Sequence, residues 1–229
     1  MELIHQAIKR LFNILLRGAG LVLILSIMLI LPWRWIAPPV SAFMLQEFID
    51  TGRRPHHKWL PLEKVSACMP ISIVAAEDQK FPLHSGFDFQ SIVNALEQNP
   101  RRPRGASTIS QQVVKNLYLW NGRSLFRKGL EAYLTVGIEA MWPKKRILEI
   151  YLNIVEFGPG VYGISEAGRI LRKRSASRLS SYDCALLTAV LPNPKRMSAA
   201  QPTRYVRKRA REIMVQVWQL GGSSYLKEL

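Results

Sequence analysis

The longest apolar stretch of this chain lies near its N-terminus. Residues 18–31, GAGLVLILSIMLIL, carry no charge, and the apolar pattern extends from Leu11 to Ile36. About 20 apolar residues are enough to cross the hydrocarbon core of a bilayer. No small-residue cleavage site of the A-x-A kind follows, so the pattern favours a retained anchor over a removed signal peptide. We predict a transmembrane signal anchor over residues 11–36, with a buried core helix as the alternative.

The charges beside this anchor predict its orientation. Lys9, Arg10 and Arg17 precede its most apolar part, whereas Arg34 and two later arginines follow it. An excess of basic residues favours the cytoplasmic side of a membrane. We therefore expect residues 1–10 to be cytoplasmic and the rest of the chain to lie outside the cytoplasm.

Beyond the anchor, the spacing of apolar positions is mainly helical. Residues 37–60 form a membrane-proximal segment, in which a partly amphipathic stretch precedes a basic turn. Convincing runs of alternating strand residues are scarce, and a helical period dominates residues 61–229. The expected helices cover residues 62–78, 88–98, 108–119, 124–142, 144–156, 162–172, 180–191 and 203–220. The fold class is thus mainly α, a domain over residues 61–229 preceded by one N-terminal transmembrane helix.

The net charge narrows the kinds of partner. Lysine and arginine number 32 against 16 acidic residues, which gives a formal charge of +16. Such an excess indicates an anionic partner, namely a nucleic acid, an anionic lipid or a phosphorylated substrate. A membrane anchor favours lipid head groups and lipid phosphates among these.

The two cysteines, Cys68 and Cys184, are far apart and lie in apolar surroundings. We expect free buried thiols, although an exported location would permit a disulfide. The sequence contains no C-x-x-C or H-E-x-x-H metal motif.

The first candidate site is the stretch EDQKFPLHSG, residues 77–86. Glu77 follows the apolar run CMPISIVAA, precedes Asp78 and lies near an expected helix C-terminus. Desolvation, a like charge and the negative end of the helix dipole all raise the pKa of a carboxyl group. A raised pKa suits a proton acceptor that works near neutrality. The alternatives are an ordinary pair of acids at a helix end, or a metal site with His84, which we interpret as a structural residue.

The second candidate is RGASTISQQVVKN, residues 104–116. Thr108 and Gln111 form a capping box, so a helix should begin there. Its first turn offers backbone N–H groups to a phosphate. Three polar side chains, Gln112, Lys115 and Asn116, share one face of this helix. The alternative is a capped surface helix with a solvated polar face.

The third candidate lies within residues 124–145. Arg127 and Lys128 are one helical turn from Glu131, so two cations and a carboxylate share a face. The usual interpretation of such spacing is an exposed salt bridge. Against it, many apolar residues surround Glu131, and charges in a buried helix tend to be paired or functional. Two acids pushed in opposite directions by their neighbours indicate divided acid–base roles.

Taken together, these stretches resemble the glycosyltransferase domain of peptidoglycan polymerases, and most closely the monofunctional biosynthetic peptidoglycan transglycosylases. The family motif E-D-x-x-F-x-x-H-x-G matches Glu77, Asp78, Phe81, His84 and Gly86. The second, G-x-S-T-[IL]-x-Q-Q-x-x-K-N, matches Gly105, Ser107, Thr108, Ile109, Gln111, Gln112, Lys115 and Asn116, and R-K-x-x-E matches Arg127, Lys128 and Glu131. A later family element, K-x-x-I-L-x-x-Y-L-N…G, is similar to Lys144, Ile147, Leu148, Tyr151, Leu152, Asn153 and Gly158 of this chain. The resemblance covers about residues 60–200 and departs at residues 170–173, where relatives often carry an aromatic segment.

The resemblance implies a lysozyme-like, two-lobed fold with a hydrophobic face near the membrane. It implies polymerisation of lipid II into β-1,4-linked glycan strands, with inversion and release of undecaprenyl diphosphate. Glu77 would be the general base, and Glu131 the second catalytic residue. The substrate-binding residues would be Asp78, Phe81, Ser107, Gln112, Lys115, Asn116, Arg127 and Lys128. No organic cofactor is expected, while Glu131 is the candidate ligand for a Mg²⁺ or Mn²⁺ ion.

The same resemblance implies a location and a set of partners. The chain would be a single-pass protein of the bacterial inner (cytoplasmic) membrane, with its catalytic domain on the periplasmic side. Its partners would be lipid II, the growing glycan-undecaprenyl diphosphate, anionic lipids, and proteins of cell-wall synthesis or division, with no nucleic acid. Two alternatives remain: a lysozyme-like lytic enzyme that cleaves glycan, and a membrane-tethered basic binding protein.

Overall fold

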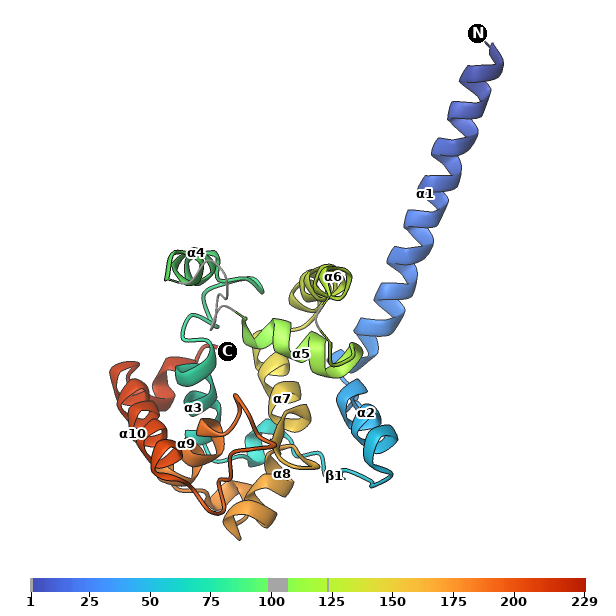
Figure 1. Cartoon of the computed structure of the whole chain (residues 1–229). Coiled ribbons are helices and arrows are strands. Elements are labelled where there is room, and N and C mark those ends of the chain that lie inside the picture. The colour runs from blue at the N-terminus through green and yellow to red at the C-terminus, as the bar shows by residue number, and fades with distance from the viewer. Residues whose placement is uncertain (1, 99–106, 123) are drawn as a thin grey trace.

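A computed structural model describes residues 2–98, 107–122 and 124–229 of the chain (Figure 1). The basic stretch NPRRPRG, residues 99–105, includes Gly105 of the second motif and lies outside the described residues.

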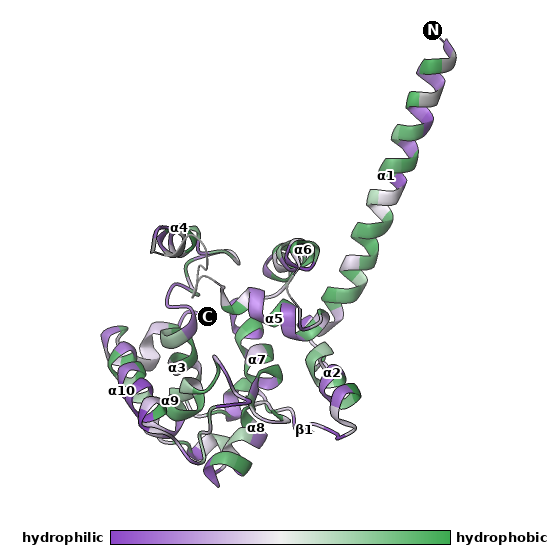
Figure 2. Cartoon of the chain, in the orientation of Figure 1, coloured by the Kyte–Doolittle hydropathy of each residue, from purple (hydrophilic) through white to green (hydrophobic). Residues whose placement is uncertain are grey.

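The N-terminal helix α1 (Glu2–Ile30) extends away from the domain, and a 3₁₀ turn, η1 (Leu31–Arg34), follows it (Figure 1). By length and composition, residues Ile4–Arg34 are able to cross a membrane. Most of their side chains are exposed, so the alternative of a buried core helix is wrong. Figure 2 shows hydrophobic residues in nearly every turn of the half of α1 nearest the domain.

The membrane-proximal segment contains a helix of its own, α2 (Ala42–Thr51). The hydroxyl of Ser41 accepts a hydrogen bond from the backbone N–H of Met44, which caps the first turn. A short strand, β1 (His56–His57), and a 3₁₀ turn, η2 (Leu62–Lys64), lead into the rest of the domain.

Helix α3 (Cys68–Glu77) begins six residues later than predicted. Pro70 explains the difference: a proline within a helix costs about 3 kcal/mol, but it is tolerated in the first turn, where its missing N–H has no partner to lose. A start at Cys68 places Pro70 in that first turn. Because Ile71, Ile73 and Val74 are all fully buried, α3 is enclosed by protein on every side.

The remaining long helices lie close to their predicted positions and confirm the mainly α fold. They are α4 (Phe89–Gln98), α5 (Ile109–Tyr118), α6 (Leu125–Met141), α7 (Lys144–Ile154), α9 (Ser181–Ala189) and α10 (Arg204–Gln219). Helices α3, α9 and α10 pack together on one side of the domain, while α5 packs on both α6 and α7 (Figure 1). A C-terminal 3₁₀ turn, η5 (Gly222–Leu226), packs against α3.

A small three-stranded sheet is present, although the sequence shows no convincing run of alternating strand residues there. Strands β2 (Glu156–Gly158) and β3 (Val161–Tyr162) form an antiparallel hairpin, and β1 pairs in parallel with β3. Strands of two or three residues are too short for a visible alternation, so the pattern missed them. Gly163 follows the hairpin with φ 77°, and a Cβ there would lie 2.6 Å from the carbonyl oxygen of Asn153.

The helix predicted over residues 162–172 is irregular. A short turn, α8 (Ile164–Glu166), continues into a π-helical segment, η3 (Ala167–Arg172), and 3₁₀ turn η4 (Ala176–Arg178) follows. Residues 170–173, where we expect a departure from the family pattern, lie in this segment. Arg172 pairs with Asp183 of α9 at 2.6 Å, which joins the segment to the helix group around α3.

The expectation of free thiols is wrong. Cys68 and Cys184 form a disulfide, with their Cα atoms 6.0 Å apart, and so join the first turn of α3 to α9. The 116 residues between the two cysteines made this pairing unreadable from sequence.

Candidate active site

Glu77 is the last residue of α3, where the apolar helix ends. Its Oε2 accepts a hydrogen bond of 3.0 Å from Nε2 of Gln112 on α5. The Oε1 of Gln112 accepts one of 3.0 Å from the hydroxyl of Tyr151 on α7, which is fully buried. The tyrosine thereby orients the amide, and the amide presents its N–H to the carboxylate.

The surroundings of Glu77 change its acidity in the predicted direction. Burial raises the pKa of its carboxyl group, and the charge of Asp78 adds a smaller rise. The hydrogen bond from Gln112 and the positive charge of Arg209 on α10 oppose these effects by lowering the pKa. Desolvation is the largest cause, so the prediction of a raised pKa is confirmed and its main reason is burial.

Asp78 holds two segments together. Its Oδ2 accepts a hydrogen bond of 2.9 Å from the backbone N–H of Ile109, the first residue of α5. Its Oδ1 lies 2.9 Å from Nε2 of His84, while Nδ1 of His84 accepts the N–H of Gly86. His84 thus closes the loop, as predicted. The prediction of a phosphate site at the N-terminus of α5 is wrong. The carboxylate of Asp78 lies there instead, and the capping box of Thr108 satisfies a further N–H.

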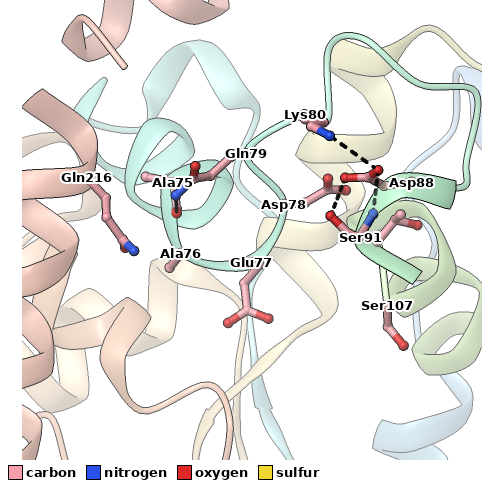
Figure 3. Close-up of a pocket in the computed structure, with 11 residues that line it drawn as sticks. Ala75, Ala76, Glu77, Asp78, Gln79, Lys80, Asp88, Ser91, Ser107 and Gln216 are labelled. Carbon is pink, nitrogen blue, oxygen red and sulfur yellow. Dashed lines mark hydrogen bonds and ion pairs between the residues drawn. The ribbon is translucent and has the colours of Figure 1, made fainter. Parts of the chain in front are cut away.

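A cavity of about 250 Å³ opens beside Glu77 (Figure 3). Ser107, next to the start of α5, and Gln216 of α10 line it from opposite sides of Glu77. Phe81, by contrast, has no exposed surface, and Nζ of Lys144 lies 4.5 Å from its ring centroid. We therefore correct the expected role of Phe81 as a substrate contact: its side chain packs the loop against the core.

The second half of the site lies on α6. Arg127 is 8% exposed and Glu131 is 3% exposed, so the exposed-salt-bridge interpretation is wrong. Nη1 of Arg127 lies 2.7 Å from Oε2 of Glu131, and the ammonium of Lys128 bonds to the other carboxylate oxygen. Ser124 caps this helix through the N–H of Arg127.

Lys115 of α5 completes this cation cluster, which we define as Lys115, Arg127 and Lys128. Burial lowers the pKa of Lys115, and the charge of Arg127 lowers it further, while Glu131 raises it. Its Nζ lies 5.3 Å from the ring centroid of Phe43 on α2. Two cations therefore bond to one carboxylate and a third interacts with it through its charge, which leaves an excess of positive charge at this point.

Helix α5 joins the two halves of the site. Gln112 contacts Glu77, and Lys115 lies three residues further along, about 4.5 Å along the helix axis. Asn116, on the same face, is buried. The alternative of a solvated polar face is wrong, because Gln112 bonds to both Glu77 and Tyr151 and burial lowers the pKa of Lys115.

Three contributors to the site were missed in the sequence. Tyr151 lay in a quoted motif, but nothing in that motif showed that it orients Gln112. Arg209 and Gln216 lie on α10, whose basic residues make much of that helix hydrophilic (Figure 2). No spacing along the chain connects them with Glu77.

The residues around Glu131 do not fit a divalent cation. Both of its carboxylate oxygens accept hydrogen bonds from cationic side chains. Across the ranges that the structure describes, no group of three or more His, Cys, Asp or Glu side chains is placed to hold a metal ion. Repulsion from the two cations also opposes the binding of a metal ion to Glu131.

A buried glutamate with a raised pKa bonds to Gln112, which lies one turn of α5 from Lys115 of the cation cluster, and this arrangement is typical of an enzyme site. The family model described as Transglycosylase matches residues 44–217, and the chain belongs to this family. The resemblance seen in the motifs is thereby confirmed, and a purely binding role is excluded.

Similar proteins named biosynthetic peptidoglycan transglycosylase support this membership. One from Xanthomonas campestris pv. campestris (strain B100) is 49% identical over 210 residues, covering 88% of this chain and 85% of the relative. One from Xylella fastidiosa (strain 9a5c) is 48% identical over 211 residues, covering 89% and 87%. One from Xanthomonas axonopodis pv. citri (strain 306) is 49% identical over 210 residues, covering 88% and 85%.

Proposed function

We propose that this transglycosylase polymerises lipid II, the lipid-linked disaccharide-pentapeptide, into β-1,4-linked glycan strands and releases undecaprenyl diphosphate. The observation that carries the proposal is the pairing of Glu77 with the cation cluster across one turn of α5. A proton acceptor and an anion site at that separation suit a sugar hydroxyl that attacks a carbon bearing a diphosphate.

Glu77 is the general base in this proposal. Its carboxylate accepts the proton of the acceptor 4-hydroxyl as that oxygen bonds to the anomeric carbon of the donor. Attack from the face opposite the leaving group inverts the α-linkage to a β-linkage. Burial raises the pKa of Glu77, which strengthens it as a base. The N–H of Gln112 holds the carboxylate in position.

The cation cluster stabilises the leaving group. The bond between the anomeric carbon and the diphosphate oxygen breaks with its electron pair on the oxygen, so negative charge grows there. A diphosphate is a weak base and needs charge stabilisation more than a proton donor. Arg127 offers a planar fork suited to phosphate oxygens, and Lys115 and Lys128 add point charges. Glu131 holds Arg127 and Lys128 in place.

We further propose that α1 crosses the bacterial inner membrane and that the domain lies on its periplasmic side. The disulfide between Cys68 and Cys184 supports this orientation, because disulfides persist in oxidising compartments and are rare in the cytosol. The exposed apolar side chains of Leu125 and Phe126 on α6 suit contact with lipid.

Polymerisation of purified lipid II by the full chain in vesicles tests the function. We expect glycan polymer to form, with one undecaprenyl diphosphate released for each glycosidic bond made. Shortening of preformed glycan without polymer would instead support the lytic alternative, in which a glutamate with a raised pKa serves as general acid. A parallel assay with EDTA, followed by addition of Mg²⁺ or Mn²⁺, tests whether the reaction requires a divalent cation.

Thiol labelling tests the orientation. Cells are quenched in acid, and the denatured protein is treated with a maleimide of high mass, with and without prior reduction. We expect no labelled cysteine before reduction and two after it. Two labels without reduction would contradict both the disulfide and the periplasmic location.

A further inference from the structure

Helix α1 is joined to α6 rather than hanging freely from the domain. The two segments meet at three points, and each step of four residues along α1 and η1 is matched by a step of four along α6. Residues four apart share one face of an α-helix, so Ser26 and Ile30 of α1 contact one face of α6 in register, and Arg34 of η1 extends the same spacing. The pairs are Ser26 with Tyr133, Ile30 with Gly137, and Arg34 with Met141.

Each of the three contacts is close. Oγ of Ser26 and the hydroxyl of Tyr133 lie 2.9 Å apart. At Gly137, an added Cβ would lie 2.6 Å from Cδ1 of Ile30, so the absence of a side chain there permits the approach. The guanidinium of Arg34 bonds to the carbonyl oxygen of Met141 near the end of α6.

The chain just past these contacts is also held. Nε1 of Trp142 donates to the carbonyl oxygen of Ile30 at 3.1 Å, which satisfies one of the free carbonyl groups at the end of α1. Arg146 of α7 donates from Nε to the carbonyl of Trp33 and from Nη2 to that of Ile36, at 2.9 and 2.7 Å. The exit from the anchor is therefore tied to both α6 and α7.

A different face of α6 carries half of the active site. Arg127 and Glu131 are buried against the domain, whereas Tyr133 and Gly137 face the anchor. Any change in the position of α6 relative to α1 therefore moves the cation cluster relative to the membrane.

We propose that the α1–α6 contact is a positioning interface, with Tyr133 and Gly137 as positioning residues, that holds the cation cluster at a set height against the bilayer. Ser26 lies about 6 Å before the end of α1 along its axis and within the span Ile4–Arg34, so α6 contacts the anchor itself and not only the chain that follows it. This inference rests on the proposed function, because only a substrate whose diphosphate lies at the head groups needs a cluster at a matching height.

The test uses two leucine variants of α6. Gly137→Leu forces the anchor away from the helix, whereas Gly129→Leu is the matched control, since a Cβ at Gly129 meets no atom within 4 Å. Both remove a glycine from the same helix. Each full-length variant is reconstituted in vesicles of neutral and anionic phospholipid, with a nitroxide on Leu125→Cys, a site 92% exposed. The depth of the nitroxide is measured from its relaxation by oxygen and by a water-soluble nickel complex.

We expect the label in Gly137→Leu to move relative to its depth in the parent, while Gly129→Leu leaves it in place. This readout needs no enzymatic activity, so it stands even if the proposed function fails. An unchanged depth in Gly137→Leu would overturn the proposal.

The activity arms use the same variants without the label. With long-chain lipid II in vesicles, Gly137→Leu should lose about 10- to 100-fold in kcat/KM, since misplacement by about 1 Å can have this effect. With a short-chain, water-soluble analogue in detergent micelles, its kcat/KM should match that of Gly129→Leu. Equal losses in both arms would mean general damage to the fold and would also overturn the proposal. Tyr133→Phe, which removes only the hydroxyl, should give the same pattern with a smaller loss.

Discussion

Glu77 and Glu131 are both buried glutamates on helices, yet their surroundings are opposite. Glu77 ends an apolar helix, and its nearest hydrogen-bond donor is the neutral amide of Gln112. Glu131 lies within a helix and bonds to the cations of Arg127 and Lys128. One carboxylate is therefore desolvated without a bonded counter-charge, and the other is desolvated with two.

The difference teaches that burial alone does not assign a role to an acid. A buried carboxylate without a close cation favours its protonated form, so it takes up a proton readily. A buried carboxylate that bonds to two cations holds those cations in a fixed position. The first arrangement suits a base, and the second suits a scaffold for binding phosphate.

The largest expected effect is on the reaction rate of Glu77→Gln. Loss of a general base lowers turnover by about 10²- to 10⁴-fold, while binding of lipid II by the cation cluster should persist. The measurement is the rate of lipid II polymerisation alongside lipid binding to the same vesicles. Glu63→Gln is the control, because Glu63 is an exposed partner of Lys145 and should have normal activity. Normal polymerisation by Glu77→Gln would show that another group is the base.

Substitution of the two glutamates by glutamine should change the stability of the fold in opposite directions. Glu131→Gln leaves two cations without their anion, and breaking a buried pair costs about 3–5 kcal/mol. Glu77→Gln removes a desolvated carboxylate and should raise Tm. Thermal unfolding of both variants at several pH values is the measurement.

The gain in stability that we expect from Glu77→Gln depends on pH in a defined way. Burial raises the folded-state pKa above the unfolded one. Below the unfolded pKa the carboxyl is protonated in both states, so no gain is expected. Above the folded pKa it is ionised in both, and the folded wild type bears the desolvation cost. A gain that is larger in acid than in base would contradict the assignment.

Gln112→Leu should affect the pH profile of the rate. Activity requires ionised Glu77, so it falls as the pH decreases through the raised pKa. Loss of the hydrogen bond that lowers this pKa moves the acid limb to higher pH. We also expect about a tenfold loss at the optimum, in line with a hydrogen bond to a charged group of about 1.5 kcal/mol. Tyr151→Phe, which frees the amide to turn, should change the profile less. An unmoved acid limb in Gln112→Leu would mean that another group limits the rate.

Arg209→Gln should produce the smallest effect. Arg209 lowers the pKa of Glu77 through its charge without a hydrogen bond, so its loss should shift the acid limb slightly upward. The shift should shrink in high salt, because the Debye length falls from about 10 Å at 0.1 M to about 3 Å at 1 M. Arg211→Gln, at an exposed position of the same helix, is the matched control. Equal shifts of the acid limb in both variants would show that the effect comes from the overall surface charge and not from the position of Arg209.

Much of the fold could be predicted because its determinants are local. The capping box at Thr108 sets the start of α5, the helical period locates α6 and α7, and the apolar run marks the anchor. The late start of α3 was also readable, since Pro70 restricts which turns are able to contain it. The strands around Gly163 were not readable, because two or three residues carry too little pattern.

The sequence by itself determined which residues carry charge, which helices hold them, and that Glu77 follows an apolar run. Only the tertiary structure decided their partners: Gln112 bonds to Glu77 across 35 residues, and Ile109 to Asp78 across 31. It also decided the disulfide and the register of the anchor on α6. The physical reason is the distance along the chain over which each effect acts, since helix capping and apolar periodicity involve only residues a few positions apart. Contacts between distant helices depend on how all the side chains pack together.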